Sequence, residues 1–261
     1  VLLVVFLVGA LLLVRLNVAK QSRQLTEKSV EIRYPFSEAA GIAQGLLKPT
    51  VADQTLMDGV IRQAHVDWFH NYILTEKDPR RAFMRTGTVK RLLKYEFSST
   101  SLGQGLALMI SALMAGEDPM AQSLFDRLLY STVVRPSLDH EDLSSWQMTP
   151  DGRHSKVNAD LHAEAWIGFA TLAAMAQWKD SVRVDYKIVS DAHLNALAGV
   201  LNREGGAAAE TAYSPYFFEI FRQVRSDLSW EAFMAKQASE TKRILAAEDA
   251  VLLGDGSNED A

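Results

Sequence analysis

Hydrophobic residues recur every three or four positions along most of this chain from Val51 onward, a spacing typical of helices that bury one face. Two helix starts carry a capping residue followed by proline, Asp118-Pro119 and Ser214-Pro215. No segment alternates between apolar and polar residues as a strand does, so the pattern predicts an all-α fold. The predicted helices span residues 53–75, 101–116, 119–132, 160–178, 185–201, 215–225 and 229–246.

The N-terminus has a different pattern, because its first fourteen residues are all apolar or glycine and are followed by Arg15 and Leu16. A membrane-spanning helix needs about 20 apolar residues, and the core of a signal peptide about 7–15. Residues 1–16 are therefore predicted to be a transmembrane anchor or a signal segment; a buried core helix is the third reading. The absence of a small-residue cleavage motif favours the anchor. By the positive-inside rule, the basic residues Arg15, Lys20 and Arg23, taken by themselves, would place the following domain in the cytoplasm.

The remaining chain divides into three parts. Residues 17–50 contain Pro35 and Pro49 without a sustained period, which predicts a tether. Residues 51–253 form the predicted helical domain, and residues 254–261 form an acidic tail. Within the domain, residues 133–159 make a long polar connection, and long loops on helical scaffolds usually carry function.

Composition narrows the possible functions. With 261 residues, of which 48% are hydrophobic and 23% charged, the chain can build one large core. A net charge of -5 and scattered basic residues make nucleic acid an improbable partner. Without cysteine, disulfides, thiolate zinc sites and cysteine nucleophiles are excluded. His65, Asp67 and His70 are read as a solvated helix face rather than metal ligands, and we expect no metal and no cofactor.

Two segments place polar groups at the start of an otherwise apolar helix. In Ser98–Met109, Thr100 and the serines can cap the helix, while Gly103 and Gly105 allow a ligand or another helix to approach closely. In Asn158–Trp178, Asp160 is suited to capping because a carboxylate is stabilised at a helix N-terminus. We expect a functional site where these two segments lie.

The second segment also carries a candidate pair of reactive side chains. His162 and Trp166 are four residues apart and share a face of the helix, whereas Glu164 is two residues from His162 and should point elsewhere. Aromatic residues that could stack on sugars, or simply fill the core, lie at several loops and helix starts. They are Trp146, Trp166, Tyr213, Tyr216, Phe217 and Trp230.

The order of these segments resembles a known family. Ser101, Gly103, Gln104 and Gly105 match a segment of the form S-E-G-Q-G, and SSWQMTPDGR around Trp146 is similar to a tryptophan loop that follows it. Asn158–Gly168 then aligns without gaps on N-S-A-S-D-A-D-L-W-I-A, and YSPYFFEIFRQVRSDLSW is similar to an N-P-S-Y-F segment followed by a helix. Together they resemble glycoside hydrolase family 8, which includes the periplasmic cellulases of cellulose-synthesis operons.

This resemblance implies an (α/α)6 toroid, of which the predicted helices would be an incomplete part. It also implies inverting hydrolysis of β-1,4-linked glucans, which requires a carboxylic acid and a carboxylate base. Three departures weaken that implication. Leu102 occupies the position of the acid, His162 replaces the first Asp of D-A-D, and the Y-D-A-x-R segment that carries the base has no match before Ala261.

The resemblance implies Glu164 and His162 as catalytic candidates. It implies Gln104, Trp146, Asn158, Trp166, Tyr213 and Tyr216 as residues that bind the substrate. The expected protein acts on a β-1,4-linked glucan or related exopolysaccharide with weak or no hydrolysis. The alternative is an inactive polysaccharide-binding protein that assists synthesis or export, and a purely structural helical repeat is the third possibility. Its partners would be the saccharide and, through the N-terminal helix, a membrane, with the domain facing the periplasm or cell exterior.

Overall fold

We describe a computed structural model of the chain. The residues it describes are 32–33, 35–36, 54–75, 78–91, 94–149, 158–179, 181–204, 215–239 and 242–243. The predicted membrane segment 1–16, the residue Tyr213 and the tail 254–261 lie outside them. Among the described residues, no helix combines the length and the apolar character needed to cross a membrane. All that follows concerns the compact unit Arg33–Ala261.

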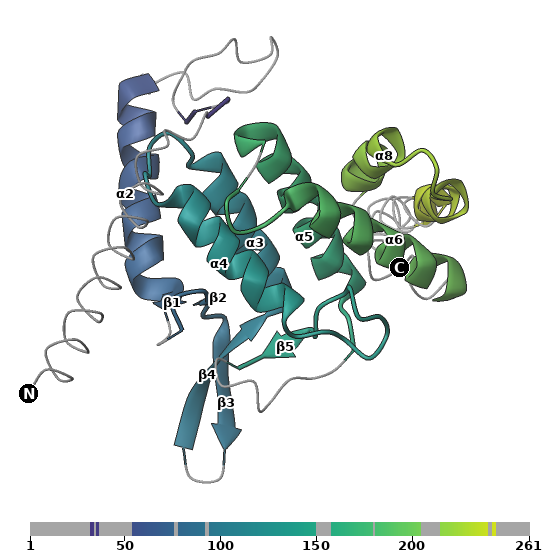
Figure 1. The fold of residues 1–261 in the computed structure, drawn as a ribbon, viewed down its shortest axis with the longest axis horizontal. Helices are drawn as coiled ribbons and strands as arrows, with labels where there is room; N and C mark the ends of the chain where they lie inside the picture. Colours follow the sequence, from purple (N-terminus) through teal and green to yellow (C-terminus); the bar gives the residue numbers. More distant parts are fainter. Residues whose placement is uncertain are drawn as a thin grey trace, which may run out of the picture. The chain divides into compact units, whose positions relative to one another are not determined.

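Helices account for most of the described residues, and all the predicted ones are present with shifted ends (Figure 1). The predicted helix 229–246 corresponds to a helical segment over 231–239. The labelled helices are α2 Gln54–Tyr72, α3 Ser101–Leu113, α4 Ala121–Val133, α5 Leu161–Trp178, α6 Tyr186–Glu204 and α8 Pro215–Val224.

The expectation of an all-α fold is wrong in one respect, because the described residues include five short strands. β1 Ile73–Thr75 pairs with β2 Ala82–Met84, and β3 Gly87–Arg91 pairs with β4 Lys94–Thr100, all antiparallel. The inner end of β4 also pairs with β5 Gln147–Met148. β1 and β2 span only three residues each and β5 only two, so they are too short to show alternation over several positions. The predicted helix 53–75 consequently ends at Tyr72, where β1 begins.

The two proline-marked helix starts behave differently. α8 begins at Pro215 as predicted. α4 begins later than predicted, at Ala121, because Asp118 first makes a turn: its Oδ1 accepts from Met120 N at 2.7 Å and its carbonyl accepts from Ala121 N at 3.0 Å. The proline therefore lies in the turn before the helix rather than in its first position.

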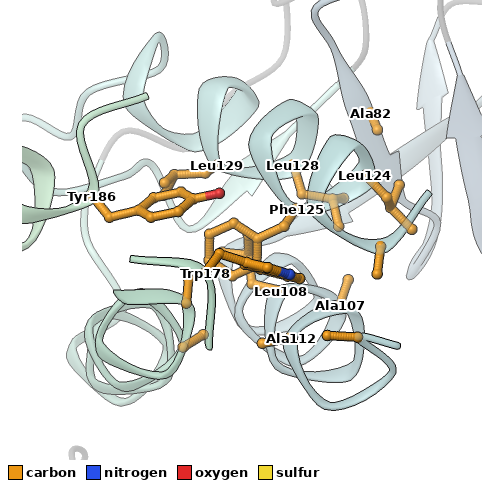
Figure 2. Packing of buried hydrophobic residues seen from close by; sticks show 14 of the residues in the cluster. Ala82, Ala107, Leu108, Ala112, Leu124, Phe125, Leu128, Leu129, Trp178 and Tyr186 are labelled. Carbon is orange, nitrogen blue, oxygen red and sulfur yellow. The ribbon is translucent and has the colours of Figure 1, made fainter. Parts of the chain in front are cut away.

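One hydrophobic core lies among α3, α4 and α5. Figure 2 shows Phe125 of α4 at its centre, with Trp178 and Tyr186 each packed edge-on against its ring at 5.5 Å between ring centres. Small residues such as Ala107 and Ala112 on α3 allow the helices to approach closely. Burial of large side chains of this kind contributes about 1.5–3 kcal/mol each.

A second core lies among α5, α6 and α8, built around Phe218, Phe221 and Trp230. α5 contributes to both cores, with Leu161 and Ala165 in the second and Ile167, Ala170, Ala174 and Trp178 in the first. A helix buried on several sides is apolar all round, as the sequence of α5 is. This central position of α5 fixes the directions in which the side chains of its first turn, His162 and Glu164, point.

The described residues before α2 also contact the helical unit. Arg33 N donates to Gln177 O at 3.1 Å and Phe36 N donates to Ala115 O at 2.7 Å. Gly116 has a φ of 92°, and a Cβ there would lie 2.5 Å from Pro35 Cβ. Part of the predicted tether 17–50 therefore packs beside the C-terminal end of α3.

Candidate functional site

The beginnings of α3 and α5 pack against each other. Thr100 caps α3, since its hydroxyl accepts from Gly103 N at 3.1 Å, and Asp160 caps α5 by accepting from His162 N and Ala163 N. A Cβ on Gly105 would lie 2.8 Å from Trp166 Cβ, so the absence of a side chain there allows the contact. Both predicted caps are confirmed, and the close approach made possible by Gly105 is to a helix.

The loop that carries Trp146 joins these two helix starts through its main chain. Trp146 O accepts from Ser101 N at 2.9 Å, and Trp146 N donates to Asn158 O at 2.9 Å. Leu102, Trp146, His162 and Trp166 are all half-buried residues of this region. We call the region formed by these four residues the α3/α5 end. Three segments that are distant in the sequence therefore meet there, as the resemblance implies.

Aromatic rings continue from the α3/α5 end onto α8. Trp166 Nε1 donates to His162 Nε2 at 3.2 Å, which fixes the relative orientation of the two rings. Trp166 packs edge-on against Phe217 at 4.8 Å, and Phe217 stacks on Phe169 at 4.3 Å. Tyr216 lies 6.2 Å from Phe169 and is 69% exposed, so it offers a ring to solvent. Phe217 is buried, so the half-buried Trp166 and the exposed Tyr216 are the rings of this series suited to stacking against the apolar faces of sugars.

Glu164 does not lie with His162. Its carboxyl is fully buried, and Oε1 accepts a 2.5 Å hydrogen bond from Ser144 Oγ, two residues before Trp146. His193 of α6 is also buried, with Nε2 2.8 Å from the main-chain O of Glu164 and Nδ1 3.6 Å from Oε2. The first turn of α5 is regular, so Glu164 and His162 point to different sides, as their spacing predicts.

Burial controls the protonation of this pair. It raises the pKa of Glu164 to about 8, an effect that the hydrogen bonds from Ser144 only partly offset. It also lowers the pKa of His193. Burial therefore favours a neutral imidazole, with its proton on Nε2 to donate to the Glu164 carbonyl, beside a neutral carboxylic acid. Glu164 thus holds the Trp146 loop on α5 through Ser144.

A cavity of about 230 Å³ lies on this side of α5. Its walls are largely apolar and come from Leu129 and Val133 of α4, Ile167 of α5 and Ile188 of α6. Glu164 and His193 also line it, but neither His162 nor Trp166 does. The cavity is therefore separate from the α3/α5 end.

Two other predicted residues have clear positions. Gln104 is fully buried: its Oε1 accepts from Met84 N at 2.6 Å, and its Nε2 donates to Ala82 O at 3.3 Å. Its amide therefore links α3 to β2 inside the protein. Asn158 is exposed next to the α5 cap. Trp230, one of the aromatic candidates, is fully buried in the second core.

The predictions missed the residues that support the site rather than form it. Ser144 and His193 lie far from Glu164 in the sequence, and no local pattern connects them to it. For metals, the structure describes no group of three or more His, Asp or Glu side chains that could hold an ion. In α2, His65 lies 3.8 Å from Asp118, and Asp67 accepts from Gln63.

Comparison with known proteins supports the resemblance. The chain is 25% identical over 170 residues to a β-glucanase of Niallia circulans. The aligned region covers 62% of this chain and 38% of that protein. It is 24% identical over 177 residues to an endoglucanase of Bacillus sp. strain KSM-330, covering 65% of this chain and 37% of that protein. No family model matches the chain.

Solved structures share the fold of this chain. A β-1,3-1,4-glucanase from Paenibacillus sp. X4 superposes with a TM-score of 0.59 at 18% identity, covering 76% of this chain and 55% of that one. Rex8A from Paenibacillus barcinonensis, solved with xylose, gives a TM-score of 0.56 at 16% identity, covering 72% and 55%.

The chain spans less than two fifths of the curated relatives and about half of the solved structures. Within that span, the mostly helical fold matches the (α/α)6 enzymes and the sequence is homologous to glucanases. The chain is thus a distant homologue of the family 8 endoglucanases and β-glucanases that its motifs resemble.

Proposed function

We propose that this chain binds a β-linked glucan or related polysaccharide at the α3/α5 end without hydrolysing it. The observation that carries the proposal is the position of the carboxyl groups. Leu102 stands where the family has its acid, Asp160 is used as a helix cap, and Glu164 is enclosed and bonded to Ser144. Loss of a general acid typically lowers a rate about 10²- to 10⁴-fold.

The surfaces suited to sugar binding are present. Trp146 and Trp166 are half-buried at the α3/α5 end, and Tyr216 adds an exposed ring on α8. One solved relative, Rex8A from Paenibacillus barcinonensis, was obtained with xylose bound and, as a point mutant, with an arabinofuranosyl-xylotetraose bound. A β-linked saccharide is the ligand that these rings and that homology favour together.

Binding and turnover can be measured on the same preparation of the full chain. We expect retarded migration in gels that contain hydroxyethylcellulose or β-1,3-1,4-glucan, with no reducing ends released. Tyr216→Ala should weaken binding about three- to tenfold, because one stacked ring contributes roughly 0.5–1.5 kcal/mol. Tyr72→Ala is the matched control, since Tyr72 is a helical tyrosine with 48% exposure at the end of α2.

Hydrolysis is the second candidate, favoured by the glucanase names of both curated relatives. Leu102→Glu restores a carboxyl at the acid position, and Leu102→Gln has similar size without the acid. Reducing ends released by the wild type would contradict the proposal. Release by Leu102→Glu but not by Leu102→Gln would show that the acid is the missing component.

A further inference from the structure

The hairpin formed by β3 and β4 exposes aromatic and basic side chains on one face. Register pairs Thr88 with Phe97 and Lys90 with Tyr95, so these four residues share a face. All four are exposed, with Tyr95 at 71% and Phe97 at 43%. The Arg85 guanidinium lies over the Phe97 ring, 4.4 Å from its centre. We call Arg85, Thr88, Lys90, Tyr95 and Phe97 the hairpin face.

The hairpin face contains two cations, Arg85 and Lys90, and no acidic residue. Glu96 pairs with Val89 on the opposite face, because side chains alternate along a strand. The chain as a whole is acidic, with a net charge of -5, so this basic surface departs from the average. A ligand that fits it has flat apolar surfaces for Tyr95 and negative charges for Lys90 and Arg85.

The hairpin face also leads directly to the α3/α5 end. β4 ends at Thr100, which caps α3, and its inner residues Ser99 and Thr100 pair with β5 next to Trp146. Figure 1 shows β3 and β4 extending away from the helices, with β5 beside their inner end. About 17 Å of strand separates Tyr95 from Thr100, which a polymer can span and a monosaccharide cannot.

We propose that the hairpin face is an extended binding surface for a polysaccharide chain that carries carboxylate or other acidic groups. The inference rests on the proposed function, because the same chain would occupy the α3/α5 end. Simultaneous contact with both regions raises the effective concentration of the polymer at each. Long acidic chains should therefore bind more tightly than neutral chains or short oligosaccharides.

Two polymers with the same backbone test this selectivity. Carboxymethylcellulose is acidic and hydroxyethylcellulose is neutral, and affinity for each is measured by gel retardation with the full chain. We expect the wild type to bind the acidic polymer about fivefold more tightly at low salt. About 0.5 M NaCl should abolish the difference, because screening weakens interactions between exposed charges.

Substitutions on the hairpin face identify the surface responsible. Lys90→Gln should lower affinity for carboxymethylcellulose about two- to fivefold and leave hydroxyethylcellulose binding unchanged. Tyr95→Thr, which suits a strand, should weaken binding of both polymers. Lys236→Gln on the helical segment 231–239 and Tyr72→Ala on α2 are the matched controls, and neither should change binding.

The outcomes separate this inference from the proposed function. Equal wild-type affinity for both polymers, or Lys90→Gln and Tyr95→Thr variants that behave as the wild type, would overturn the inference while the proposed function stands. Failure to bind either polymer would overturn both. A change in sedimentation coefficient caused by Tyr95→Thr, without any change in polymer binding, would indicate a contact with a second copy and would also overturn the inference.

Discussion

Among single residues, Glu164 shows most clearly how burial decides chemistry. A carboxyl two positions from His162 is a reasonable catalytic candidate from the sequence, yet this one is enclosed between Ser144 and His193. Its Oε2 has no hydrogen-bond partner, which is costly for an ionised oxygen and tolerable for a protonated one. In this structure the residue links α5 to the Trp146 loop through Ser144.

The raised pKa of Glu164 makes folding stability depend on pH. In the folded protein, Glu164 keeps its proton up to about pH 8. In the unfolded chain its pKa has the usual value of 4.5, so the proton is released at a lower pH. The stabilisation is complete below pH 4.5 and is lost as pH rises through 8. Glutamine at position 164 cannot titrate. The free energy of unfolding of Glu164→Gln, relative to that of the wild type, should therefore rise by roughly 3–5 kcal/mol from acidic to mildly alkaline pH.

Thermal unfolding of both proteins from about pH 5 to pH 9 checks this prediction. The difference in Tm between Glu164→Gln and the wild type should increase with pH. A difference independent of pH would show that Glu164 has an ordinary pKa. Glu219→Gln is a control on an exposed carboxyl whose pKa is lowered by Arg222.

The sequence could predict which residues cap helices but not which carboxyl is buried. Thr100 and Asp160 are identified by local rules that involve only the next few residues. The burial of Glu164 depends on Ser144 and His193, 20 and 29 positions away, and α5 is too uniformly apolar to indicate its buried side. The sequence also does not separate an exposed aromatic residue such as Tyr216 from a buried one such as Trp230.

Among the elements, the contact between α3 and α5 depends on Gly105. A Cβ there would lie 2.8 Å from Trp166 Cβ and 3.3 Å from Ile167 N, and main chain cannot move aside as a flexible side chain can. Gly105→Ala should therefore destabilise the protein by about 1–3 kcal/mol and weaken polysaccharide binding by displacing Trp166.

Gly199 on α6 provides the comparison for Gly105. It has no neighbouring atom within 4 Å of the added Cβ, so Gly199→Ala should be neutral or stabilising by up to about 1 kcal/mol. Urea unfolding of the two variants measures both effects. Equal stabilities for the two variants would mean that the helices separate without cost.

Strands were the elements that the sequence did not predict. In β4, Tyr95 and Phe97 alternate with polar residues, but they face solvent and the pattern ends after these two positions. β-branched and aromatic residues gathered at Thr88, Val89, Tyr95 and Phe97 were the available signal. Helices were predicted well because their spacing repeats over several turns and both cores depend on it.

In the molecule as a whole, α5 joins the two hydrophobic cores. Ile167 and Trp178 belong to the core around Phe125, and Leu161 and Ala165 to the core around Phe218. Neither core can open without exposing apolar residues of the same helix. We therefore expect the described unit to unfold in a single cooperative transition.

Two core substitutions test this cooperativity. Phe125→Leu in the first core and Phe221→Leu in the second should each cost roughly 1–2 kcal/mol and lower the same Tm. Far-ultraviolet circular dichroism and tryptophan fluorescence should report coincident curves, since Trp178 and Trp230 lie in different cores. Two separate transitions would show that the cores are independent.

β4 continues into α3 without an intervening loop, since Thr100 is its last residue and Ser101 begins the helix. A force applied to the hairpin would therefore act on a strand that is anchored in α3. Along β4, main-chain hydrogen bonds to β3 and β5 would share that tension in shear, the direction in which several bonds must break together. The junction of Thr100 and Ser101 therefore couples the hairpin mechanically to the core.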